Sequence, residues 1–130
     1  MQVITVKTSK KKEVVDITDN LEEVLRKEKV KDGVCNLFVT HTTAALTVAD
    51  LDPGTDQVLL DAYTGMVPKI DYRHSHNPSH VGGHILSALI GVSLNVPFKQ
   101  GKLILGTWQR VVLIDFDGPR ERSVNIWIPL

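Results

Sequence analysis

The sequence predicts an α+β fold that forms a single domain over residues 1–130. Apolar and polar residues alternate in several short segments, which is the pattern of half-buried strands. Longer segments repeat apolar residues at helical spacing and interrupt the strands along the chain. Because 42% of the residues are apolar and short turns join several strands, we expect locally paired strands around one hydrophobic core.

Turn and cap residues indicate where these elements begin and end. The predicted strands cover residues 2–8, 13–17, 33–43, 44–50, 92–97, 102–105, 108–116 and 123–128. The predicted helices begin at Asp19, at Thr55 and near Asn77, and they end at Gly33, about Gly65 and Gly91. The stretch from 66 to 79 has no periodicity and is rich in Pro, Asp and His, and such loops often carry sites.

The N-terminal part allows three more specific predictions. The strands at 2–8 and 13–17 are expected to pair as a hairpin. Asp19 is expected to cap the first helix, because Glu22 follows three residues later, as in a capping box. Gly33 is expected to end that helix, because glycine adopts a positive φ without strain.

Composition narrows the classes of function. The chain has 15 basic and 15 acidic residues, so it does not have the charge of a general nucleic-acid or membrane binder. Cys35 is the only cysteine, which fits core packing in a reducing compartment. The sequence shows no segment long enough to span a bilayer and no signal-peptide pattern, so a cytoplasmic location is expected.

Histidines cluster in one part of the chain, since four of the five lie between residues 74 and 84. His74 and His76 would point the same way in an extended segment, whereas His80 and His84 are one helical turn apart. The second spacing suits two helical ligands of one metal ion. Each histidine taken alone is more often an ordinary surface residue.

His41 has a different setting, at the end of the predicted strand 33–43. It shares a strand face with Leu37 and Val39, so we expect it to face the core or a cleft. There it could be a core histidine that bonds to a backbone carbonyl. The threonine hydroxyls around it, including Thr42, favour a functional site instead.

Two signatures in the last third of the chain are unusual for simple strands. Residues 106–109 read Gly-Thr-Trp-Gln and residues 117–120 read Asp-Gly-Pro-Arg. Trp108 could pack in the core, whereas Gln109 shares its strand face with apolar residues and would need partners for a buried amide. Arg120 and Arg122 have planar guanidinium groups suited to phosphate or carboxylate. The two arginines could equally form surface salt bridges with Asp115 and Asp117.

Together the motifs resemble a known family. They comprise the helix start at His84, the step from Gly91-Val92-Ser93 to Val96-Pro97, the Leu-Gly-Thr-Trp-Gln run at 105–109, and the Asp-Gly-Pro-Arg-Glu-Arg run at 117–122. Over nearly its whole length the chain is similar to the YjbQ-like family (uncharacterised protein family 47). The resemblance implies a largely antiparallel or mixed sheet, half-barrel or sandwich-like, with about three helices, in a homotrimer.

The resemblance also implies an activity and a set of site residues. Some members are associated with a secondary thiamine-phosphate synthase activity, which joins a pyrimidine diphosphate to a thiazole phosphate and releases pyrophosphate. The ligand would be a small phosphorylated metabolite, and a divalent metal, zinc or magnesium, would serve as cofactor. The expected catalytic residues are His41, Asp50 and His84. The expected substrate-binding residues are Thr42, Trp108, Gln109, Asp117, Arg120 and Arg122. The expected metal ligands are His41, His74 and His84, with His76 and His80 as alternatives to His74.

Two other functions remain open at this point. A metal-dependent hydrolase of a phosphorylated metabolite would use a histidine-bound metal to activate water, with Asp50 as general base. A trimeric binding or structural protein would instead place its histidines at subunit interfaces. Neither alternative involves nucleic acid or a membrane.

Overall fold

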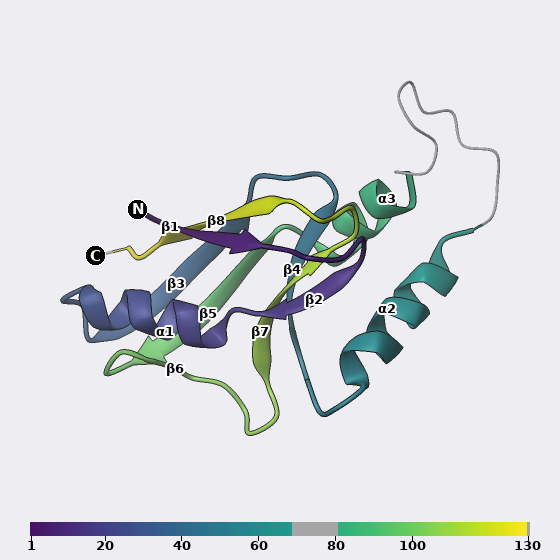
Figure 1. The fold of residues 1–130 in the computed structure, drawn as a ribbon. Coiled ribbons are helices and arrows are strands. Elements are labelled where there is room, and N and C mark those ends of the chain that lie inside the picture. The colour runs from purple at the N-terminus through teal and green to yellow at the C-terminus, as the bar shows by residue number, and fades with distance from the viewer. Residues whose placement is uncertain (69–80, 130) are drawn as a thin grey trace.

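The computed structural model describes residues 1–68 and 81–129 (Figure 1). The described residues form three helices, which are α1 (Thr18–Lys27), α2 (Thr55–Met66) and α3 (Val81–Ile90). The strands are β1 (Gln2–Lys7), β2 (Glu13–Asp16), β3 (Asp32–Val39), β4 (Ala44–Ala49), β5 (Ser93–Lys99), β6 (Lys102–Leu103), β7 (Arg110–Asp115) and β8 (Glu121–Trp127).

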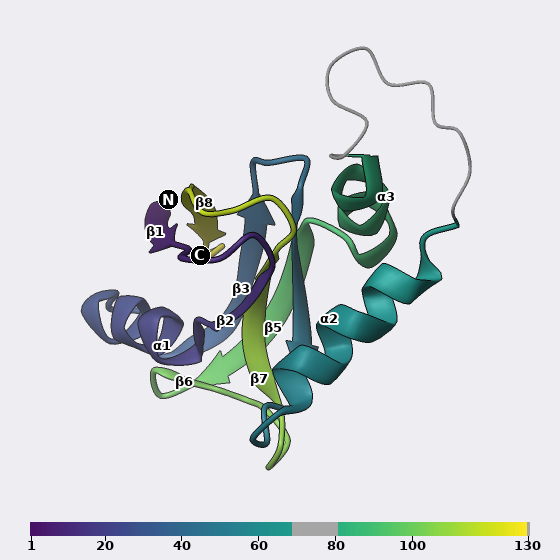
Figure 2. The same ribbon diagram turned by 45° about the vertical axis from the view of Figure 1, so that its right-hand side comes forward.

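The strands form two antiparallel sheets. The larger sheet has the order β1-β8-β3-β5-β6, and the smaller one has the order β2-β7-β4. α2 and α3 lie together on one side of the smaller sheet, whereas α1 lies on the opposite side of the molecule (Figure 2). The α+β class and the largely antiparallel pairing are therefore confirmed.

The main core fills the space between the two sheets and α1. It is formed by apolar side chains that alternate with outward-facing side chains along the strands, as expected for sheets with one face buried. Its fully buried members include Ile17, Leu21, Leu25, Cys35, Leu37, Val39, Val111, Leu113, Val124 and Ile126. Cys35 is a free thiol packed in this core, as its sequence context predicted.

A second, smaller core lies under α2 and α3. β7 separates the two cores, because Val111 and Leu113 face the first while Val112 and Ile114 face the second. Burial on both faces explains why β7 reads as an unbroken apolar run rather than an alternating strand. Leu86 of α3 packs in the second core and holds that helix against the small sheet.

The predicted hairpin between the first two strands is wrong. β1 pairs with β8, and β2 pairs with β7, so the two strands lie in different sheets. The connection between them crosses from one sheet to the other and is anchored at both ends. The Thr8 hydroxyl bonds to the Asp115 carboxylate, and the Lys11 carbonyl accepts the Gly118 N–H.

Both cap predictions for the first helix are also wrong. α1 begins at Thr18, whose N–H is bonded by the Asp16 carboxylate at 2.9 Å, and it already ends at Lys27. Glu22 accepts the Leu103 N–H from β6 instead of closing a capping box. Gly33 lies within β3, where the Phe98 ring packs so closely that an added Cβ would lie 3.2 Å from it.

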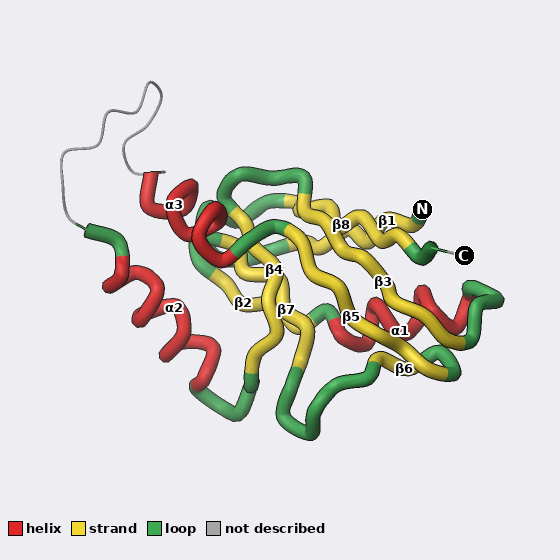
Figure 3. The backbone as a smooth tube through the Cα atoms, turned by 180° about the vertical axis from the view of Figure 1, so that it is seen from behind, coloured by secondary structure: helices red, strands yellow, loops and turns green. Residues whose placement is uncertain are grey.

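The outer face of the larger sheet mixes apolar side chains with polar and charged ones, such as Lys7, Asn36 and Glu121. Its exposed side chains include Val3, Val34, Phe38 and Trp127, and they alternate with buried ones along β1, β3 and β8. α1 covers the inner face only, since it lies in front of β3 and β5 in Figure 1 and behind them in Figure 3. None of the described helices is both long and apolar enough to cross a membrane.

Candidate functional site

The connection between β3 and β4 carries the first candidate residues. β3 ends at Val39 rather than at residue 43, so His41 and Thr42 stand in a loop and not on a strand. This loop and α3 form the two sides of an open groove of about 500 Å³. The groove is lined by Phe38, Val39, Thr40, His41, Thr42, His84, Ser87, Ala88 and Val92. His41 and His84, which are far apart in the sequence, therefore share one groove.

Two features hold α3 beside this loop. The Ser87 hydroxyl donates to the Ala44 carbonyl at 2.7 Å, at the point where the loop enters β4. Gly83 lets the helix approach closely, because an added Cβ would lie 3.2 Å from Phe116 Cβ and 3.5 Å from Thr43 Cγ2. The glycine near the helix start thus serves packing within the chain.

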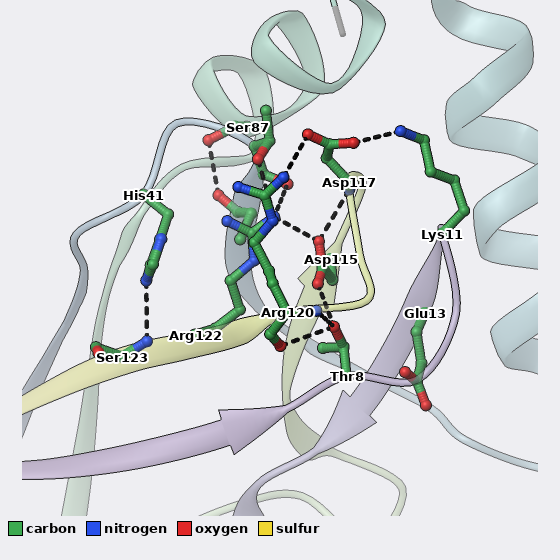
Figure 4. A network of polar contacts seen from close by, with 12 residues as sticks. Thr8, Lys11, Glu13, His41, Ser87, Asp115, Asp117, Arg120, Arg122 and Ser123 are labelled. Carbon is green, nitrogen blue, oxygen red and sulfur yellow. Dashed lines mark hydrogen bonds and ion pairs between the residues drawn. The ribbon is translucent and has the colours of Figure 1, made fainter.

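His41 is held by a backbone hydrogen bond. Its Nε2 accepts the Ser123 N–H from β8 at 3.0 Å, as the close view shows (Figure 4). Burial lowers the pKa of His41, and the nearby Arg122 and Arg120 lower it further, while Asp115 opposes them. The ring is therefore favoured in its neutral form, with Nε2 as the acceptor.

Arg122 and Asp115 form a buried ion pair behind the groove. Their side chains are 1% and 0% exposed, and Arg122 Nη2 lies 2.6 Å from Asp115 Oδ1. The same Nη2 donates to the Thr43 hydroxyl at 2.8 Å, and the Thr8 hydroxyl donates to the other Asp115 oxygen at 2.6 Å. Arg122 thus joins β7, β8 and the His41 loop, and its burial rules out the surface salt bridge considered from the sequence.

The pKa of Asp115 reflects this network. Burial raises it, but the hydrogen bonds from Arg122, Thr8 and the Asp117 N–H, with the positive charge of Arg122, outweigh burial. The net effect is a pKa below the ordinary value, so Asp115 is a carboxylate at neutral pH. The Nε of Arg122 is the one buried side-chain nitrogen or oxygen without a hydrogen-bond partner among the described residues.

The turn between β7 and β8 supplies the remaining charges. Asp117 is nearly buried and pairs with Lys11 and with Arg120, whose Nη2 lies 2.9 Å from its carboxylate (Figure 4). The side chain of Arg120 is 48% exposed, so this guanidinium keeps part of its surface toward solvent. Of the two predicted anion-binding arginines, Arg120 alone is accessible to a ligand.

Three of the predicted site residues lie at the far end of the small sheet. Ala44 pairs with Asp115 at the groove end of β4, whereas Ala49 pairs with Arg110 at the other end. Five strand steps separate these ends by roughly 17 Å. Asp50, Trp108 and Gln109 lie beyond the far end, so one chain does not bring them to the groove.

The geometry of this far end corrects the predicted strand at 108–116 and decides between the two positions considered for Trp108. β7 begins at Arg110, so Trp108 and Gln109 belong to a turn and both are exposed. The Gln109 side chain accepts the Gly106 N–H at 2.8 Å, and Trp108 is 68% exposed rather than packed in the core. The Asp50 carboxylate accepts the Asp52 N–H at 3.0 Å and shapes the turn before α2.

The described residues do not provide the predicted metal site. Within residues 1–68 and 81–129, no three His, Cys, Asp or Glu side chains gather closely enough to hold a metal ion. The Nε2 of His41 already accepts the Ser123 N–H, and so its lone pair is engaged. His74, together with His76 and His80, lies outside the described residues.

Several residues of this region were not recognised as candidates from the sequence. Thr8, Ser87 and Ser123 carried no motif signal, because their roles depend on contacts between segments distant in the chain. Asp115 had been considered only as a surface partner of an arginine. Its position at the end of the unbroken apolar run of β7 was the available sign of burial.

Comparison with known families gives a consistent match. The family model described as "UPF0047 protein YjbQ-like" matches residues 2–129. A UPF0047 protein of Methanocaldococcus jannaschii is 36% identical, with 95% of this chain and 89% of the relative covered. The UPF0047 protein YugU of Bacillus subtilis is 32% identical, with 97% of this chain and 96% of the relative covered.

Solved structures share this fold. A crystal structure of an uncharacterised YjbQ/UPF0047 protein of Clostridium acetobutylicum has a TM-score of 0.89 and 35% identity, over 99% of this chain and 100% of that one. A hypothetical protein of Aeropyrum pernix has a TM-score of 0.90 and 32% identity, over 98% of this chain and 96% of that one. These descriptions give a family and a fold, and they give no activity.

Proposed function

This chain belongs to the YjbQ-like UPF0047 family, and on that premise we propose that it binds and converts a small phosphorylated metabolite in the groove shared by His41 and His84. One observation carries the proposal: His41 and His84 line the same groove, and the partly exposed guanidinium of Arg120 lies near enough to His41 for its charge to act on that imidazole. A guanidinium group near two imidazoles suits a phosphate ester.

The reaction proposed is the secondary thiamine-phosphate synthase reaction that the family resemblance implies. The ring nitrogen of a thiazole phosphate would attack the methylene carbon of a pyrimidine diphosphate. The carbon–oxygen bond would break, and pyrophosphate would leave with the electron pair. Because negative charge grows on the leaving group, Arg120 and an N–H donor of the groove would stabilise it.

Assembly is part of the proposal. Because one chain keeps Asp50, Trp108 and Gln109 at the far end of the small sheet, they can serve the groove only from a neighbouring chain. The homotrimer implied by the resemblance would provide such a neighbour. The outer face of the larger sheet exposes Phe38 and Trp127, and aromatic side chains are enriched at subunit interfaces.

The test is an assay of pyrophosphate release by the purified protein. We expect release only when both the pyrimidine diphosphate and the thiazole phosphate are present. His84→Gln should lower the rate by roughly 100-fold if this imidazole donates a proton to the departing pyrophosphate oxygen. Lys27→Gln on the exposed face of α1 is the matched control and should leave the rate unchanged.

Other outcomes would point to the functions left open by the sequence. Release of phosphate from a single ester, dependent on a divalent metal, would replace the synthase with a hydrolase. Binding of both phosphorylated compounds without any turnover would make the protein a binding protein. Within one chain Asp50 lies away from the groove and bonds to a turn N–H, so the hydrolase mechanism lacks its general base there.

A further inference from the structure

His41 occupies the place of a missing strand partner. β3 and β8 pair up to Val39 opposite Val124, and β3 then ends. The next N–H of β8, that of Ser123, would lack a partner if His41 Nε2 did not accept it at 3.0 Å. The imidazole therefore completes the edge of the sheet with one of its two nitrogens.

The loop that carries His41 is fastened at two points by consecutive residues of β8. Ser123 holds the imidazole, and Arg122 holds Thr43 through its hydroxyl at 2.8 Å. Arg122 is itself fixed by Asp115 in the buried ion pair. Rotation of the ring or movement of the loop would break these bonds, so the ring orientation is well determined.

A nitrogen that accepts a hydrogen bond from a backbone N–H carries no proton. In a neutral imidazole the proton must then lie on Nδ1. Arg122 and Arg120 lie near the ring and, with burial, disfavour a second proton, although Asp115 opposes this. Among the described residues, the only hydrogen bond to the ring is the one from Ser123.

We infer that Ser123 fixes His41 in the Nδ1–H form, so that His41 serves the groove as a hydrogen-bond donor to an anionic oxygen and does not ligate a metal through Nε2. The donor role rests on the proposed function, because it needs an anion in the groove. The protonation pattern itself does not. Ser123 acts here as a positioning residue, and it acts through its backbone N–H.

The protonation pattern can be measured directly. We would record the imidazole nitrogen chemical shifts of the full-length protein by two-dimensional NMR, at a pH above the pKa of histidine. The signals of His41 are assigned as those missing from the spectrum of His41→Gln. We expect a protonated Nδ1 and an unprotonated Nε2. A protonated Nε2, or rapid averaging between the two forms, would overturn the inference whether or not the protein is an enzyme.

The donor role is tested by two amide substitutions and inorganic pyrophosphate as the probe. In His41→Asn the amide can place an N–H near the former Nδ1, whereas in His41→Gln it can reach only the former Nε2 position. We expect calorimetry to show roughly 10-fold to 100-fold weaker binding for the Gln variant and a smaller loss for the Asn variant. Equal affinity of the Gln variant and the wild type would refute the donor role.

These measurements separate the two proposals. If the synthase assay shows no turnover while NMR finds the proton on Nδ1, the proposed function fails and the assignment of the proton stands. If turnover is found and NMR finds the proton on Nε2, the function stands and the inference about His41 fails. A thermal melt of each variant confirms that a lost signal does not reflect unfolding.

Discussion

The two ends of the small sheet differ in how deeply their ion pairs are buried. At the groove end, Arg122 and Asp115 are buried and bond to each other and to threonine hydroxyls. At the far end, Arg110 bonds to Asp16 at 2.7 Å, but both side chains are about one-third exposed. The same type of ion pair therefore lies in apolar surroundings at one end and in water at the other.

This difference separates the two sequence motifs, because one lies inside the chain and the other lies at its surface. The Asp-Gly-Pro-Arg-Glu-Arg motif organises the inside of one chain, because its buried Arg122 pairs with Asp115 and bonds to Thr43 in the loop of His41. The Gly-Thr-Trp-Gln motif forms an exposed turn with Trp108 turned to solvent. The exposed Trp108 side chain is therefore available to a ligand or a neighbouring chain.

The strongest test of this contrast removes one arginine from each end. Arg122→Met leaves the Asp115 carboxylate buried without its cation, which should cost about 3–5 kcal/mol in the free energy of unfolding. Arg110→Met breaks an exposed pair and should cost less than about 1 kcal/mol. Urea unfolding monitored by circular dichroism measures both. Equal losses would mean that the two ends are energetically alike.

The pH dependence of stability should show the same contrast more weakly. The folded-state pKa of Asp115 is lowered, so its stabilising contribution is complete above the unfolded value of about 3.9 and is lost as the pH falls through the lower folded value. The difference in unfolding free energy between wild type and Asp115→Asn should therefore shrink below about pH 4. Urea unfolding over a pH series measures it.

The matched variant for this experiment is Asp16→Asn at the far end. Burial raises the pKa of Asp16, but hydrogen bonds from Thr18 and Arg110 outweigh it, so the direction of the effect is the same. Because this pair is partly exposed, its contribution should be smaller and should weaken with salt. The opposite result would contradict the assignment of a buried and an exposed end. In that case salt would weaken the contribution of Asp115 to the free energy of unfolding and leave that of Asp16 unchanged.

Much of the fold could be predicted from the sequence, because strand periodicity and turn residues are local signals. The pairing of β1 and β2 could not, since partner choice depends on contacts between distant segments such as Thr8 and Asp115. For the site, the sequence proposed His41 and His84, and the structure brings these two residues to one groove. The sequence did not reveal the burial of Arg122, because arginine is rarely buried, even though Arg122 shares its strand face with Val124 and Ile126.

Two adjacent glycines at the groove end allow a smaller, local test. Gly83→Ala would press a methyl group to 3.2 Å from Phe116 Cβ, so overpacking should cost about 1–3 kcal/mol, less the gain in helix propensity. Gly82→Ala meets only Val67 at 3.9 Å and should stabilise the helix by up to about 1 kcal/mol. Thermal unfolding of both variants measures the difference. A stabilised Gly83 variant would show that α3 can move away from the His41 loop.

The smallest effect on stability should come from Trp108. Since its side chain is 68% exposed, Trp108→Ala should change the free energy of unfolding by less than about 0.5 kcal/mol. Its effect on pyrophosphate release should be large if Trp108 serves the groove of a neighbouring chain. Val58→Ala, on the exposed face of α2, controls for the loss of an exposed apolar side chain.

Mixing two inactive variants decides whether the two ends meet between chains. Unfolding and refolding Trp108→Ala together with His84→Gln would produce assemblies in which some grooves combine an intact His84 with an intact Trp108 from a neighbour. Activity should then return in a fraction of the sites, although each variant alone stays inactive. If mixing restores nothing, Trp108 does not act across a subunit boundary. His84 and Trp108 line different pockets within one chain. The exposure of Trp108 would then need another explanation.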